Sequence, residues 1–224
     1  MRFVNSIRAS YGALRLLSWL SGFLNLFCRR FDRGKNRTAR AGVTLPSGLL
    51  NGQDLPPLSQ LPYGAWRMGC NGCEVIAVYN ALLALGRPEP LHAVAAELEE
   101  KGLLFNGFGG TNLPAVAAFF RRRGIGLTLL RRRDRRSYDA AFAAADCAVL
   151  SYWTGPKLRR ADRHWNTLHT VSLHPHPAGV SVCNVYGDSA RPMIVSSVEQ
   201  FLTRQNAVPV LLLALKRGGE TGRV

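Results

Sequence analysis

The chain has 224 residues, of which 47% are hydrophobic, and a formal net charge of +15. This apolar fraction excludes an intrinsically disordered chain and is enough for one domain with a hydrophobic core. The sequence holds no uninterrupted run of 18 apolar residues, so it predicts no membrane-spanning helix. Its five cysteines are an odd number, which favours reduced thiols over a disulfide framework and predicts a cytoplasmic protein.

The positive charge lies in two segments. Residues 1–40 carry a net +8 and residues 121–136 a net +7, while the rest of the chain is neutral. The chain is therefore not a uniformly basic nucleic-acid coat. The arginines of residues 121–136 could meet a phosphate-rich or acidic partner. No aromatic residues alternate with them and no nucleic-acid motif accompanies them, which favours a solvated helix end and loop over a nucleic-acid interface.

Residues 1–40 predict an amphipathic helix followed by a basic tail. Leu16, Leu20 and Phe27 recur at helical spacing, and basic residues follow from Arg29 onwards. One interpretation is a helix on an anionic membrane surface, which would place the protein on the inner face of the membrane. A helix packed on the domain or on a partner, and a divergent signal sequence, are the two alternatives.

The rest of the chain predicts one α+β domain. Residues 41–66, rich in Gly and Pro, form an extended linker or a segment that wraps the domain. The domain spans residues 67–217 and precedes a flexible tail of residues 218–224. Helices come first and antiparallel strands follow, which is not typical of a doubly wound parallel sheet. The expected helices are residues 73–85, 91–101, 111–122, 138–145 and 197–203, and the expected strands are residues 125–130, 147–153, 169–173, 180–186 and 208–215.

Cys73 is the leading candidate nucleophile. It follows the turn-prone Asn71-Gly72 and opens a helix that is apolar almost all round, which predicts a helix at the centre of the fold. A cysteine at this place faces unpaired N–H groups and the positive end of the helix dipole, and both favour the reactive thiolate. The alternative is that Cys73 is only a small buried residue.

A nucleophilic cysteine needs a base, and the base needs a group that orients it. His169 opens one strand of an expected hairpin, and Asn184 lies on the other strand. If the hairpin sets them side by side, the Asn184 amide oxygen accepts a hydrogen bond from one ring nitrogen and the other nitrogen points at Cys73. Asp188 is an alternative third residue beyond the strand, and His169 alone could be a structural histidine.

This order of motifs resembles the papain-like cysteine peptidases over about residues 60–215. A cysteine opens a buried helix that ends at Gly86, His-x-Val-x-Leu follows at 169–173, and Val-x-Val-x-Asn follows at 180–184. The motifs are most similar to the compact bacterial branch that includes the double-glycine (bacteriocin-leader) peptidases, in which the helix also ends in Gly at this distance. The resemblance implies a papain-like fold, with a central helix packed on an antiparallel sheet, and a cysteine peptidase or amidase that uses no cofactor.

The chain departs from that family at three positions. Glu74 follows the nucleophile where the family has Gly, Arg67 stands where a Gln donates to the oxyanion, and Val185 follows the third residue where Pro is common. A side-chain amide could replace the Gln. Asn71 is the nearest candidate and Gln60 the second, although Asn71 could equally be only a turn residue. The departures leave open a papain-like module that binds at a membrane without turnover.

Cys70 and Cys73 also form a Cys-x-x-Cys pair, which is the pattern of a redox site at a helix start. No clear strand precedes the pair, and the first thiol of such a pair is normally the attacking one. A zinc site would need a second ligand pair, and no Cys or His lies near Cys147 or Cys183 at metal-ligand spacing. We therefore expect a peptide or amide substrate and no metal, and the sequence does not indicate an oligomeric state.

Overall fold

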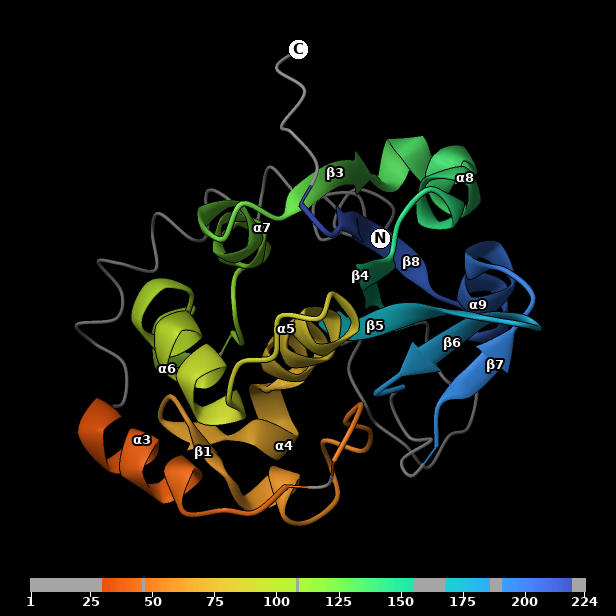
Figure 1. The fold of residues 1–224 in the computed structure, drawn as a ribbon. Coiled ribbons are helices and arrows are strands. Elements are labelled where there is room, and N and C mark those ends of the chain that lie inside the picture. The colour runs from red at the N-terminus through yellow and green to blue at the C-terminus, as the bar shows by residue number, and fades with distance from the viewer. Residues whose placement is uncertain (1–29, 46, 108, 155–167, 186–190, 219–224) are drawn as a thin grey trace.

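The helices of the N-terminal half come before one large sheet. The computed structural model describes residues 30–45, 47–107, 109–154, 168–185 and 191–218. Their helices are α3 (Arg33–Ala41), α4 (Met68–Asn71), α5 (Cys73–Ala84), α6 (Leu91–Lys101), α7 (Leu113–Arg122), α8 (Tyr138–Ala143) and α9 (Val198–Arg204), with shorter 3-10 turns η1 (Leu58–Gln60), η2 (Phe105–Gly107) and η3 (Arg132–Ser137). Helix α5 lies in the centre of the molecule, between the other N-terminal helices and the sheet (Figure 1).

Six strands form an antiparallel sheet in the order β3-β8-β4-β5-β6-β7. They are β3 (Gly126–Arg131), β4 (Cys147–Trp153), β5 (Leu168–His176), β6 (Gly179–Cys183), β7 (Met193–Val195) and β8 (Val208–Lys216), and a separate hairpin pairs β1 (Pro62–Tyr63) with β2 (Trp66–Arg67). Strand β8 is the last in the chain, yet it lies between β3 and β4. The antiparallel pairing after a helical half confirms the α+β class.

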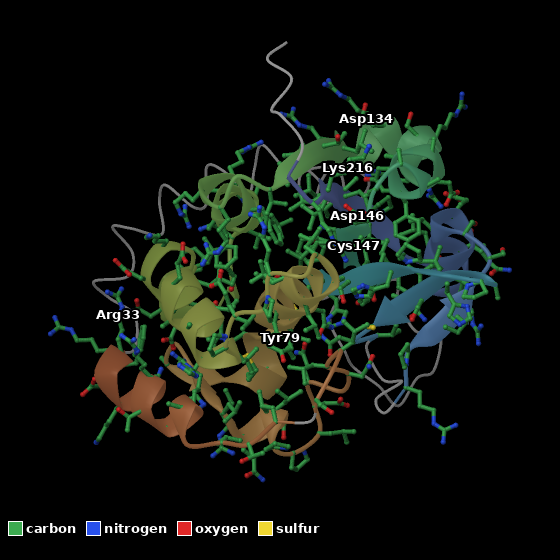
Figure 2. All side chains as sticks on the ribbon, viewed as in Figure 1. Arg33, Tyr79, Asp134, Asp146, Cys147 and Lys216 are labelled. Carbon is green, nitrogen blue, oxygen red and sulfur yellow. The ribbon has the colours of Figure 1, made fainter. Side chains whose placement is uncertain are left out.

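The sheet separates two hydrophobic clusters because side chains alternate along each strand. In β4, Cys147 and Val149 face a cluster built with α5, α6 and α7, whereas Ala148 faces a cluster built with α8 and α9. Figure 2 shows Cys147 inside the molecule and Arg33 at its periphery. Strand β5, which follows β4 in the sheet, likewise presents one face to α5 and the other to the second cluster.

Helix α5 begins at Cys73 and ends where the sequence predicts. Gly86 has a φ of 67°, a left-handed conformation that glycine adopts without strain and that stops a helix. The buried Asn80 joins the helix to its neighbours: its Oδ1 accepts from the Leu50 N–H at 2.7 Å and its Nδ2 donates to Ser172 Oγ at 3.1 Å. The helix is therefore fixed against β5 by polar contacts as well as by its apolar faces.

The last part of the basic N-terminal segment packs on the domain. Arg40 of α3 forms two hydrogen bonds of 2.7 Å with the carboxylate of Glu99 on α6, and both side chains are buried. Residues 41–66 also pack against the domain, with Leu50 and Leu58 in its core. The expectation of an extended linker is thus replaced by its alternative, a segment that wraps the domain.

The expected amphipathic helix falls mainly in residues 1–29, which lie outside the described residues, as do residues 219–224 of the expected tail. Contact of this segment with an anionic membrane therefore stays a prediction. Within the described ranges, no helix has the length and apolar character that crossing a membrane requires.

The arginine-rich segment defined above forms ion pairs within the chain. Arg123 pairs with Glu89 at 2.6 Å, and Arg135 pairs with Glu199 at 2.6 Å. These arginines come from the end of α7 and from η3, where a helix end and a loop are expected. Because the pairs offset part of the local charge, they support a solvated surface over a nucleic-acid interface.

The buried His174 of β5 makes the fold sensitive to acid. Its Nε2 lies 3.0 Å from Ser172 Oγ, and burial lowers the pKa of His174 to about 4. Unfolding exposes the ring and returns its pKa to about 6.5. The unfolded state therefore binds more protons between these two values, so this part of the stability is present above pH 6.5 and is lost as the pH falls towards 4.

We expect the free energy of unfolding to drop between pH 7 and pH 5 by about 2 kcal/mol more in the wild-type chain than in His174→Gln. Urea denaturation of both chains at the two pH values measures this difference. His176, exposed on the same strand, is the matched control, and His176→Gln keeps the wild-type pH dependence. Equal pH dependence of His174→Gln and wild type would contradict the assignment.

Candidate active site

The Cys73 thiol lies in the wall of a cavity of about 340 Å³. Cys73 is the first residue of α5 and is 5% exposed. The cavity lies between the start of α5, the loop that joins α6 to α7, and the neighbouring ends of β4 and β5. Its apolar walls come mainly from Leu104, Phe105, Leu113, Trp153 and Leu168. A small uncharged group that enters this cavity can reach the thiol.

Glu74 turns its carboxylate back onto the thiol that precedes it. Cys73 Sγ donates to Glu74 Oε2 at 3.3 Å, and Thr170 Oγ1 donates to Glu74 Oε1 at 3.1 Å. Glu74 is only 2% exposed. Burial raises the pKa of this carboxyl, although hydrogen bonds from its own N–H, from these side chains and from the Thr111 N–H act in the opposite direction.

The Cys73 thiol is neutral in this arrangement. Burial raises its pKa well above the ordinary value, and the neighbouring Glu74 carboxylate raises the pKa further. The main-chain N–H groups of Thr170 and Glu74 lower the pKa by less. The sequence predicts a thiolate at the positive end of the helix, whereas burial and the nearby Glu74 carboxylate both act against a negative charge on Sγ and raise the pKa of the thiol.

His169 lies near the start of β5, and its ring is fixed by two contacts. Its Nε2 is 2.6 Å from the main-chain oxygen of Asn184, and its ring packs edge-on against Tyr152 with 5.8 Å between centroids. A carbonyl oxygen only accepts, so Nε2 carries the proton and Nδ1 carries the lone pair. Burial lowers the pKa of His169 to about 4, and the bond to Asn184 offsets this in part. The imidazole is therefore neutral at pH 7.

Asn184 contacts His169 through its main chain and not through its side chain. Its backbone is left-handed, with a φ of 67°, and the carbonyl reaches the ring. The side chain instead bonds to Gln53: Oδ1 accepts from the Gln53 N–H at 3.0 Å and Nδ2 donates to Gln53 Oε1 at 2.9 Å. The expected residue thus contacts the histidine, but the expected bond from the ring to the amide oxygen is replaced by a bond to the carbonyl.

The structure brings Cys73 to the edge of β5, one residue from His169. The contact runs from the Thr170 N–H to the thiol sulfur, while His169 contacts Asn184 and Tyr152. Three elements that are distant in sequence therefore meet at this point.

The two side-chain amides expected at the oxyanion are not directed at the thiol. Asn71 lines the cavity, but its Nδ2 donates to the Gly107 carbonyl at 2.6 Å, and its Oδ1 is buried without a hydrogen-bond partner among the described residues. Gln60 lines a neighbouring hollow with Trp66 and Arg67. In this conformation Asn71 therefore holds the loop 105–107 in place, which agrees with the alternative that it is only a turn residue.

Sequence reasoning missed Gln53 and Thr170 as members of the site. Gln53 has no recognisable signal, because its partner Asn184 lies far along the chain. Asp188, the alternative third residue, lies outside the described residues. Cys70 is an exposed free thiol. Across the ranges that the structure describes, no three Cys, His, Asp or Glu side chains gather as metal ligands would.

No family model matches the chain, and no curated protein matches it. Among solved structures, the chain is similar to the crystal structure of a double glycine motif protease from an AMS/PCAT transporter in complex with the leader peptide. The two chains share 14% sequence identity with a TM-score of 0.40, over 64% of this chain and 83% of that chain.

Proposed function

We propose that the chain is a cysteine-dependent hydrolase that cleaves a peptide or amide bond through Cys73. The observation that carries the proposal is the position of the thiol. It stands at the start of a buried helix and in the wall of a cavity, and it contacts Thr170, the residue that follows the neutral His169 on β5. A neutral imidazole is a competent base, because its lone pair can take the thiol proton.

In the proposed reaction His169 is the general base and Asn184 its positioning residue. Nδ1 takes the proton from Sγ while the sulfur attacks the acyl carbon, and the resulting oxyanion is held by the main-chain N–H of Cys73. Collapse of this intermediate expels the amine, which takes the proton from the ring, and leaves a thioester. Water then hydrolyses the thioester, and the ring passes a proton from the water back to the sulfur.

The cavity favours a substrate with an uncharged or apolar group beside the scissile bond. Leu104, Phe105 and Trp153 offer apolar surface to such a group. Glu74 disfavours an acidic group there, since two carboxylates in a buried site repel each other. An uncharged peptide segment is therefore the substrate class that fits these walls.

The proposal extends to the place where the enzyme works. The expected amphipathic helix and the basic residues near it would hold the domain against an anionic membrane on its cytoplasmic side. Arg40 takes no part in this contact, because it is buried against Glu99.

Reaction with a peptidyl acyloxymethyl ketone tests the proposed nucleophile. We expect Cys73 to be modified by this substrate-like electrophile, and His169→Ala to slow that modification roughly a hundredfold. Peptide mapping gives the rate at each cysteine, so the exposed Cys70 serves as an internal reference that His169→Ala leaves unchanged. His176→Ala, at an exposed position of the same strand, is the matched control. Modification of Cys73 that is indifferent to His169 would refute the assignment.

A second candidate is a binding module without turnover. The observation that favours it is the bond from Asn71 to Gly107, which turns the nearest expected side-chain amide away from the oxyanion. This candidate predicts that apolar peptides protect Cys73 from modification but are not cleaved. Mass spectrometry of a peptide mixture incubated with the protein separates the two functions, since only the hydrolase yields products that disappear in Cys73→Ala.

A further inference from the structure

Glu74 is a buried carboxylate that forms no ion pair with a described Lys, Arg or His side chain. Its hydrogen bonds come from the Cys73 thiol, the Thr170 hydroxyl and main-chain N–H groups. Glu99, the other buried glutamate, has Arg40 as a counter-ion. A buried charge without a counter-ion destabilises a fold, so it is most often found where it acts on a reactive group. Here the reactive group that it contacts is the Cys73 thiol.

The carboxylate also occupies the N-terminal end of α5. The Glu74 N–H interacts with both its own carboxylate and the Cys73 sulfur. At a helix start such N–H groups would otherwise stabilise a thiolate or an oxyanion. The N-terminal end of α5 thus already stabilises the negative charge of Glu74. This charge repels a second negative charge on Sγ.

We infer that Glu74 is a positioning residue that holds Cys73 as a neutral thiol, with its proton donated to Oε2. The inference rests on the proposed function, because it assigns a control to the same nucleophile. A protonated thiol resists alkylation and oxidation between turnovers. One side chain supplies the negative charge beside the thiol, so the isosteric substitution Glu74→Gln removes that charge.

The groups around this pair do not provide a competing charge. Tyr63 bonds to Thr111 beside Glu74, and Tyr152 lies near Cys73. Burial raises the pKa of both phenols well above the ordinary value, so both are neutral over the range in which a thiol titrates. The proposed base His169 is likewise neutral there, because burial lowers its pKa to about 4. The Cys73 pH profile between pH 6 and pH 10 therefore reports mainly on Glu74.

The test is the rate of Cys73 alkylation by iodoacetamide from pH 6 to pH 10, in wild type, Glu74→Gln and Glu74→Asp. We expect Glu74→Gln to lower the midpoint of the pH profile by at least one unit and to raise the rate at pH 7 about threefold or more. This gain is smaller than the gain in thiolate, because a less basic thiolate is a weaker nucleophile. Glu74→Asp keeps the charge and is expected to keep the slow rate.

The rate of the buried Cys147 in the same samples shows whether the domain stays folded, since this thiol reacts only if the core opens. An unchanged Cys73 rate in Glu74→Gln, with Cys147 still protected, would overturn the inference, and a slower rate would overturn it and assign Glu74 as a base. If Glu74→Gln unfolds the site, the wild-type midpoint decides: a midpoint at the ordinary thiol value of about 8.5 overturns the inference. Failure of the proposed function is seen separately, as peptidyl ketone labelling of Cys73 that does not depend on His169.

Discussion

Removing the Glu99 carboxylate by Glu99→Ala is expected to lower the free energy of unfolding by about 3–5 kcal/mol. The Arg40 guanidinium would then stay buried without a counter-ion, since its two nitrogens each lie 2.7 Å from a Glu99 oxygen. The same carboxylate accepts from Asn36 Nδ2 at 2.8 Å and from the Gly64 N–H at 2.8 Å. All these donors lose their bonds to Glu99 together, while Asn36 Nδ2 keeps the Gly64 carbonyl and Arg40 Nη1 keeps the Pro62 carbonyl. We therefore expect α3 and the β1–β2 hairpin to detach together from α6. Urea denaturation monitored by tryptophan fluorescence measures the loss.

Two further variants distinguish the contribution of the buried ion pair to the free energy of unfolding from that of side-chain packing. In Arg40→Met with Glu99→Leu both charges are replaced by apolar groups, and we expect most of the lost stability to return. The exposed pair of Arg135 and Glu199 is the matched control, where Glu199→Ala should change the free energy of unfolding by less than about 1 kcal/mol. A Glu99→Ala effect no larger than this control would show that α3 does not depend on the pair.

The sequence predicts the elements of the domain well because their signals are local. The helix expected at 91–101 and the strand expected at 147–153 have the bounds that the structure gives to α6 and β4. Asn112 caps α7 by accepting from the Ala115 N–H at 2.7 Å, as a capping residue does. Periodicity, caps and helix-ending glycines are properties of neighbouring residues, so one sequence is enough to find them.

The parts that the sequence missed depend on contacts between distant segments. Strand β7 has three residues, too few for a pattern, and is defined by its pairing with β6. The connection between the strands expected at 169–173 and 180–186 is shorter in the structure, because β5 continues to His176 and only Pro177 and Ala178 form the turn. Helix α3 is polar, and its link to the domain is an ion pair between residues far apart in the chain, which no local pattern reveals.

The difference between local signals and contacts of distant segments also explains which features of the candidate site the sequence predicts. The order of Cys73, His169 and Asn184 is readable from the sequence, and the structure places His169 against Asn184. Which atom of Asn184 meets the ring depends on a left-handed backbone and on Gln53, and neither is visible locally. The pKa of the Cys73 thiol depends on its burial beside Glu74 as well as on the helix dipole, and the burial is not visible in the local sequence.

The Asn184→Ala variant is expected to lose about 3 kcal/mol of stability and most of the reactivity of Cys73 towards a peptidyl ketone. Alanine is strained by roughly 1–2 kcal/mol in the left-handed conformation that this position requires. The Gln53 N–H and Oε1 also lose their buried partners, at about 1 kcal/mol or more each. Relaxation of the backbone moves the carbonyl that holds His169, so the base loses its orientation.

Asn184→Gly separates the main chain from the side chain. Glycine accepts the same conformation, so it loses the bonds to Gln53 but keeps the carbonyl in place for His169. We therefore expect Asn184→Gly to be destabilised by about 2 kcal/mol yet to retain peptidyl ketone labelling of Cys73 close to wild type. Equal loss of labelling in the Ala and Gly variants, at temperatures where both are folded, would show that the amide itself orients the ring. The alternative result, labelling retained only with Gly, would assign that role to the backbone of Asn184.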